Sequence, residues 1–143
     1  MIEKVSHNKK LLSIIIRSKY KSDGIEFFTP GDFSQQLGYM NRKKNHMILP
    51  HTHNIVKREI SLTQEVIIIK SGKVRVDYYD NDKNYLESKI LYKGDVVLLA
   101  GGGHGFQMLE DSEMIEVKQG PYAGDMDKKI FNPVEKNDLK INK

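Results

Sequence analysis

Short apolar runs rich in β-branched residues recur along the chain, and turn-forming residues separate them at intervals of about 8 to 12 residues. This spacing is typical of a β-sandwich or a β-barrel. The longest apolar runs, residues 66–69 and 96–100, have the length of strands and fall well short of the roughly 20 residues of a membrane-spanning helix. Helical periodicity is weak, and we expect only short helical turns, near residues 5–12 and 125–130.

About eight to ten segments are expected to form strands. They are residues 14–16, 25–28, 36–40, 47–49, 65–70, 74–79, 85–91, 96–99, 106–109 and 114–118. Residues 74–79 alternate, so that Val74, Val76 and Tyr78 face one way and Arg75, Asp77 and Tyr79 the other. The sequence therefore predicts an all-β fold.

The length of 143 residues suits one domain, which we place at residues 1–133. A chain of this size buries roughly two-thirds of the surface that it exposes when unfolded, enough for a single core. Residues 134–143 are polar, and we expect them to form a C-terminal tail that frays.

The composition and the net charge limit the kinds of site and partner that the chain can have. The chain has no cysteine, so disulfides, thiolate metal sites and cysteine nucleophiles are excluded, and nitrogen and oxygen must hold any metal. The net charge of +4 is spread along the chain, which predicts no nucleic-acid partner. The N-terminus lacks the layout of a signal peptide, so we expect a cytoplasmic protein with no membrane partner.

Three histidines and one glutamate form the most informative pattern. His51 and His53 are two residues apart, so in a strand both imidazoles would lie on one face. Glu65 begins an apolar strand and shares a face with Ile67 and Ile69, which would bury its carboxylate. A divalent cation would offset the cost of that burial. His104 follows a glycine run, and the four side chains together suit Fe(II), Mn(II), Ni(II), Co(II) or Zn(II).

The order of these residues resembles the two motifs of the cupin superfamily. His51-Thr52-His53, Glu65 and Gly72 match the second half of the first motif, and Gly94-Asp95 followed by Ala100-Gly101-Gly102-Gly103-His104 resembles the second. The likeness covers about residues 38–118. It implies a single jelly-roll β-barrel, with short helical turns at the termini, in which His51, His53, Glu65 and His104 hold one divalent metal ion.

The chain departs from the cupin pattern at two points. Residues 54–64 separate His53 from Glu65, where the family has three or four residues, and we expect residues 54–63 to be an inserted excursion. Glu59 stands closer to the usual spacing and is the rival ligand, although Glu65 is preferred because it begins the strand that ends near Gly72. Ala100 occupies the place of the second motif's proline.

Further polar residues are candidates for catalysis or for substrate binding. Glu116, Lys118 and Tyr122 are the candidate catalytic residues, and Tyr39, Arg58 and Gln107 are the candidate substrate-binding residues. Glu116 and Lys118 share a face, which either lines the pocket or pairs on the surface, and the surface interpretation is slightly favoured.

Residues 101–106 and 116–122 also resemble small stand-alone bacterial cupins that are associated with surface-polysaccharide biosynthesis. The resemblance implies a metal-dependent isomerase or epimerase acting on a sugar or nucleotide sugar. A non-catalytic module that binds a small ligand and an Fe(II)-dependent dioxygenase are the alternatives. The family likeness also implies a homodimer, in which Ile14–Ile16 is a candidate for exchange between subunits.

Overall fold

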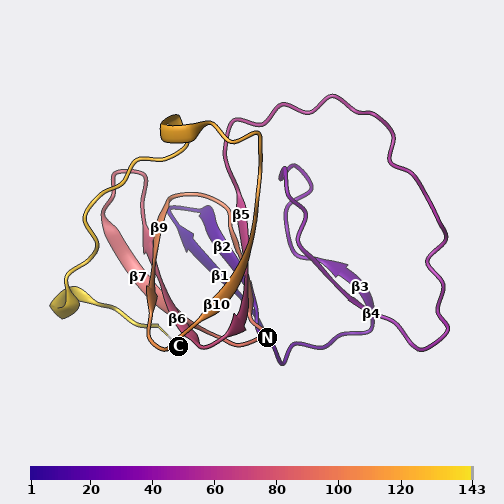
Figure 1. The fold of residues 1–143 in the computed structure, drawn as a ribbon, viewed down its shortest axis with the longest axis horizontal. Helices are drawn as coiled ribbons and strands as arrows, with labels where there is room; N and C mark the ends of the chain where they lie inside the picture. The colour runs from indigo at the N-terminus through magenta and orange to yellow at the C-terminus, as the bar shows by residue number, and fades with distance from the viewer. Residues whose placement is uncertain (143) are drawn as a thin grey trace. The chain divides into compact units, whose positions relative to one another are not determined.

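The computed structural model describes residues 1–142, and contacts within the chain divide it into two compact units. Residues 1–20 and the chain from Thr63 onward form the larger unit, and residues 21–62 form the smaller one. The strands of the larger unit are β1 (Ile2–His7), β2 (Lys10–Ile16), β5 (Glu65–Ser71), β6 (Lys73–Tyr79), β7 (Tyr85–Tyr92), β8 (Val96–Leu99), β9 (Gly103–Met108) and β10 (Glu113–Lys118) (Figure 1). Short 3₁₀ turns follow at Gly124–Met126 and Lys136–Asp138.

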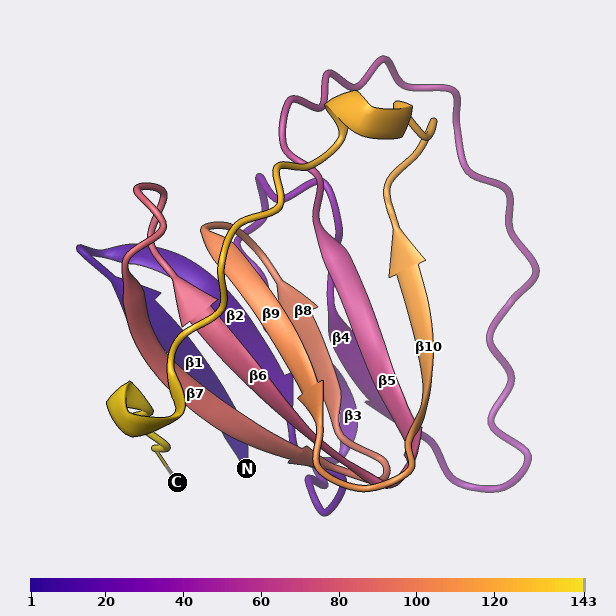
Figure 2. The same ribbon diagram turned by 60° about the vertical axis from the view of Figure 1, so that its left-hand side comes forward.

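The larger unit consists of two antiparallel sheets that share one core (Figure 2). One sheet has the order β1-β2-β8-β5-β10, and the other has the order β7-β6-β9. Val74, Val76 and Tyr78 of β6 face the core, opposite Ile67 and Ile69 of β5. The predicted all-β fold is therefore confirmed. Strand pairing leaves the two sheets separate within residues 1–142, so the jelly-roll barrel stays a prediction.

Two local predictions are wrong. Residues 5–12 form no helical turn, because β1 and β2 pair as a hairpin whose turn residues, Asn8 and Lys9, have φ values of 49° and 63°. The expected strand at residues 47–49 is absent: this segment is irregular, and Met47 and Leu49 are exposed. An apolar run forms a strand only where a neighbouring strand completes its hydrogen bonds.

The smaller unit contains one hairpin, in which β3 (Gly24–Phe27) pairs with β4 (Gly38–Asn41). No regular secondary structure is assigned from residue 42 to residue 64, a stretch that ends just inside the larger unit. The predicted excursion at residues 54–63 is thus part of a longer irregular segment. No helix among the described residues has both the length and the apolar character needed to cross a membrane.

Gly72 is required by the geometry of the turn between β5 and β6. Its φ is +81°, and a Cβ atom there would lie 2.3 Å from the carbonyl oxygen of Asp111. A side chain would therefore strain the backbone and collide with the β9–β10 connection. The turn between β5 and β6 thus explains why glycine stands at the position that matches the first cupin motif.

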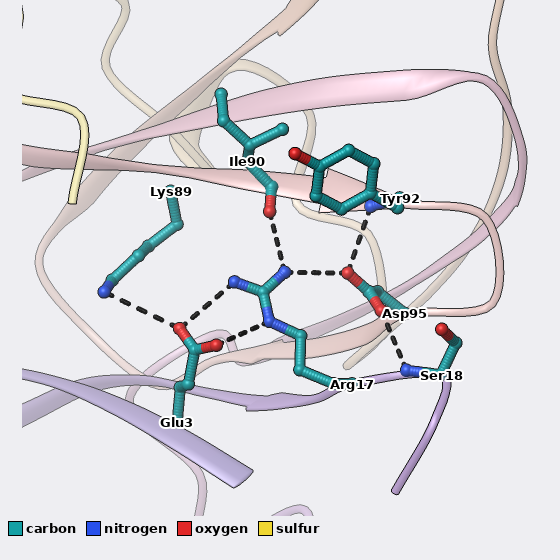
Figure 3. Close-up of polar contacts among 7 residues, drawn as sticks. All are labelled: Glu3, Arg17, Ser18, Lys89, Ile90, Tyr92 and Asp95. Carbon is teal, nitrogen blue, oxygen red and sulfur yellow. Dashed lines mark hydrogen bonds and ion pairs between the residues drawn. The ribbon is translucent and has the colours of Figure 1, made fainter. Parts of the chain in front are cut away.

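A charged network ties β1 and β2 to β7 and to the turn that precedes β8 (Figure 3). Arg17 donates to Glu3, to Asp95 at 2.7 Å and to the carbonyl oxygen of Ile90. The carboxylate of Asp95, only 2% exposed, also accepts from the backbone N–H groups of Ser18 and Tyr92. The Gly94-Asp95 pair of the second motif therefore stabilises the fold, away from His104.

The C-terminal segment is bound to the three-stranded sheet. The N–H of Ser88 in β7 donates to the carbonyl of Lys140 at 2.8 Å, and the N–H of Asn142 donates to the carbonyl of Ser88 at 3.0 Å. Ile141 and Ser88 form a parallel bridge. The expectation that the tail frays is wrong for residues 134–142, because polar residues can still be fixed by backbone hydrogen bonds to an edge strand.

Candidate functional site

Glu65 and His104 form a close side-chain pair between the two sheets of the larger unit. The Oε2 atom of Glu65 lies 3.0 Å from Nε2 of His104, and their side chains are 20% and 29% exposed. Glu65 begins β5 in the five-stranded sheet, and His104 is in β9 of the three-stranded sheet. Two of the four predicted metal ligands therefore meet, although 39 positions (104 − 65) separate them in the chain.

Strand alternation brings the two side chains together. Glu65 shares the inward face of β5 with the buried residues Ile67 and Ile69, as the sequence predicts. His104 lies opposite the buried Tyr78 of β6, and Phe106, two residues further along β9, packs against the core. The imidazole and the carboxylate thus approach from the inner faces of two different sheets.

The surroundings of Glu65 favour its ionised form. The hydrogen bond with His104 lowers the pKa of Glu65, and burial opposes this effect. The positive charges of Lys118 and Lys128 lower that pKa further. An ionised carboxylate is the form that binds a cation or accepts a proton.

Lys118 and Glu116 lie on the same face as Glu65. In the pairing of β10 with β5, Lys118 is opposite Glu65 and Met114 is opposite Ile69, and Met114 packs against the core. Met114, Glu116 and Lys118 therefore share one face of β10, on which Lys118 lies beside Glu65 and Glu116 stays exposed. Glu116 and Lys118 also pair with each other, 3.6 Å apart.

Two more contacts position Lys118. Its Nζ atom lies 3.8 Å from Oδ2 of Asp127 and 5.4 Å from the centre of the Tyr122 ring. All three predicted catalytic residues thus belong to one cluster, together with Asp127. Sequence reasoning missed Asp127 and Lys128, because the fold of the segment after β10 gives them their place and no motif marks them.

His51 and His53 lie in the smaller unit, within irregular chain. Both are exposed, and their ring centroids are 5.2 Å apart. Nδ1 of His51 lies 3.0 Å from the carbonyl oxygen of Leu49. The strand that was expected to align them is absent, because residues 42–64 pair with no other strand; the two rings are neighbours without it.

The candidate substrate-binding residues and the rival ligand lie either in the smaller unit or on the opposite face of a strand from the Glu65–His104 pair. Arg58 and the rival ligand Glu59 are exposed in the smaller unit, and Tyr39 is in β4 of the same unit. Gln107 is in β9 but lies opposite Arg75, on the other face of the strand from His104. The structure therefore does not bring Gln107 to the pair.

The donor atoms of the pair suit a divalent metal. A carboxylate oxygen and an imidazole nitrogen are the ligand types that first-row divalent ions accept from a cysteine-free chain. Within residues 1–142, no group of three or more histidine or acidic side chains is placed to hold a metal ion. Glu65 and His104 are thus two donors of suitable type, with no third placed beside them among the residues that the structure describes.

No family model, curated protein or solved structure matches this chain. The likeness to cupins accordingly rests on the two sequence motifs.

Proposed function

We propose that the protein is a metal-dependent enzyme of the cupin type, with Glu65 and His104 as two of the ligands of one divalent ion. The observation that carries this proposal is the 3.0 Å approach of Glu65 Oε2 to His104 Nε2 between two sheets. The His-Thr-His motif predicts His51 and His53 as ligands too, and this prediction rests on the sequence alone.

The substrate class follows from the polar groups around the pair. Lys118, Glu116, Asp127 and Tyr122 offer charges of both signs and a hydroxyl group. Such a lining suits a small molecule with several oxygen atoms, and we propose a sugar or nucleotide sugar in an isomerase or epimerase reaction. A bound metal would act as a Lewis acid on adjacent carbonyl and hydroxyl oxygens.

The chain's own residues would move the proton. The carboxylate of Glu116 is half-exposed, so a substrate can reach it, and it can accept a proton from a carbon next to a carbonyl and return it. Lys118 is oriented by Glu116 and Asp127 and can stabilise the negative charge that develops on oxygen.

Metal titration tests whether Glu65 and His104 bind a divalent ion. Calorimetric titration with Zn(II), Mn(II), Fe(II), Ni(II) and Co(II) should show one site per chain. Glu65→Gln and His104→Gln should each weaken binding by more than about 100-fold, since loss of even a supporting residue costs about 10- to 100-fold. Glu59→Gln and His46→Gln are matched controls that should bind as the wild type does. Tight binding that survives Glu65→Gln and disappears in Glu59→Gln would contradict the assignment.

Hydrogen exchange at a substrate carbon tests the proposed isomerase or epimerase reaction. The metal-loaded protein should exchange a carbon-bound hydrogen of a sugar or nucleotide sugar with deuterium from the solvent, and Glu116→Gln should slow this exchange by about 10²- to 10⁴-fold. Substrate-dependent oxygen uptake would instead identify the Fe(II) dioxygenase. Ligand binding without any exchange or turnover would identify the non-catalytic module.

A further inference from the structure

The outer face of the three-stranded sheet is buried, although it points away from the core. In β6, Arg75 and Asp77 are 8% and 3% exposed, and Ser88 of the adjacent β7 is fully buried. An antiparallel sheet with one face on the core normally presents such polar side chains to water. Residues 131–142 lie across this face of the sheet (Figure 2), bonded to Tyr79, Tyr85 and Ser88, and we call this segment the C-terminal strap.

Beneath the strap the polar groups satisfy one another. Arg75 donates two hydrogen bonds to the carboxylate of Asp77, at 2.7 and 2.9 Å. Ser88 donates to the same carboxylate, and its Oγ atom lies 2.7 Å from the hydroxyl oxygen of Tyr85. This set of side chains is complete without the strap, so lifting the strap would break none of these bonds.

The strap is held near its two ends, at residues 131–134 and at residues 140–142. The ring of Phe131 packs edge-to-face on Tyr79, with centroids 5.0 Å apart, and the N–H of Val134 donates to the Tyr79 hydroxyl at 2.9 Å. The N–H of Lys140 donates to the hydroxyl of Tyr85, and backbone hydrogen bonds join Lys140 and Asn142 to Ser88. No residue from 131 to 142 is fully buried.

Detachment of the strap is therefore inexpensive compared with loss of a core strand. A core strand exposes several buried apolar side chains when it leaves, whereas this strap exposes mainly the Tyr79 ring, together with an ion pair and hydroxyl groups that water solvates well. Detachment would leave the backbone N–H and C=O groups of Ser88, at the free edge of β7, without their hydrogen-bond partners.

We propose that the strap is exchangeable, and that the outer face of β6 and β7 binds the C-terminal strap of a second copy of this chain. An identical segment makes the same bonds in either copy, so exchange needs no new interface. Asp127 is held at Lys118, so the free connection to the strap is residues 128–130, which span about 10 Å at roughly 3.5 Å per residue and allow the strap to reach a copy that lies close by. β2 is a poorer candidate for exchange, because it pairs with β1 and β8 and carries fully buried core residues.

Disulfide trapping in the full chain tests this proposal, and the chain's lack of cysteine makes each introduced thiol unique. The side chains of Glu87 in β7 and Asn142 in the strap are in contact. A Glu87→Cys chain mixed with a mass-tagged Asn142→Cys chain, in a glutathione buffer, can join these positions only between copies. A mixture of Glu110→Cys with the same tagged chain is the control, since Glu110 is exposed in the β9–β10 turn.

The mixed 87–142 pair should give a heterodimer in at least several-fold excess over the control, and the excess should grow with protein concentration. Phe131→Ala, which removes the aromatic contact, should reduce this excess several-fold. The double variant Glu87→Cys/Asn142→Cys checks docking itself, because it should also close within one chain at high dilution.

Two results would overturn the proposal. In the first, the double variant closes within one chain at every concentration while the mixed pair never exceeds the control. In the second, the double variant forms no disulfide between these positions at all, which would mean that the strap does not dock on β7.

Discussion

The larger unit contains two inward-facing carboxylates, Asp95 and Glu65, that differ in the number and kind of their hydrogen-bond partners. Asp95 is almost completely buried, and Arg17 and two backbone N–H groups occupy its oxygens. Glu65 is 20% exposed and has one close partner, His104, whose imidazole can itself ionise or bind a metal. A carboxylate surrounded by fixed donors stabilises a fold, whereas one with a single adaptable partner keeps the capacity to bind a ligand.

Asp95→Asn should have the largest effect on stability. The amide cannot accept from all three donors, and the partly buried Arg17 guanidinium keeps only Glu3 as a charge partner, so we expect a loss of about 3–5 kcal/mol in the free energy of unfolding. Urea denaturation measures this loss. Asp82→Asn, in the exposed β6–β7 loop, is the matched control and should change stability by less than about 0.5 kcal/mol. Equal effects of the two substitutions would remove the contrast between the pairs.

Glu3→Gln should have an intermediate effect, because Glu3 accepts from Arg17 and pairs with Lys89 at the edge of the same network. We expect a loss of about 1–3 kcal/mol near neutral pH, the range for hydrogen bonds to charged groups. Thermal or urea unfolding would show it, and Glu110→Gln, in the exposed β9–β10 turn, serves as the control. A wild-type midpoint for Glu3→Gln would show that Asp95 alone fixes Arg17.

The same residue predicts a pH dependence. The hydrogen bond from Arg17 lowers the pKa of Glu3 below its ordinary value of 4.5 in the folded state. Its contribution to stability is therefore complete above that ordinary value and is lost as the pH falls through the lowered one. The wild type should lose its advantage over Glu3→Gln across this acidic window. A difference that stays constant through the window would contradict the role of the Glu3 charge.

Glu65→Gln should have the smallest effect on stability, within about 1 kcal/mol, because the amide can still hydrogen-bond His104 and water reaches both side chains. The same substitution is expected to abolish tight metal binding, so stability and function should separate at this pair. Urea denaturation without metal provides the comparison with Asp95→Asn. A loss as large as that of Asp95→Asn would make the Glu65–His104 pair structural.

Much of the larger unit follows from local pattern. Alternation placed Val74, Val76 and Tyr78 in the core and turned Glu65 inward with Ile67 and Ile69, because a buried sheet face selects apolar side chains at every second position. The His-Thr-His segment shows the limit of this reasoning. Residues two apart share a face only in a strand, and a strand needs a neighbouring strand to pair with. The sequence of residues 51–53 does not show whether such a neighbour exists, and the structure has none there.

The sequence by itself determined the all-β class, most strands of the larger unit, the lack of thiol chemistry and the identity of Glu65 and His104 as candidate ligands. Only the tertiary structure decided that Glu65 and His104 meet, that Asp127 positions Lys118, and that the polar tail docks on Ser88 of the three-stranded sheet. The reason is physical: alternation and turn residues are local properties, whereas contacts between residues far apart in the chain depend on how the two sheets and the tail pack.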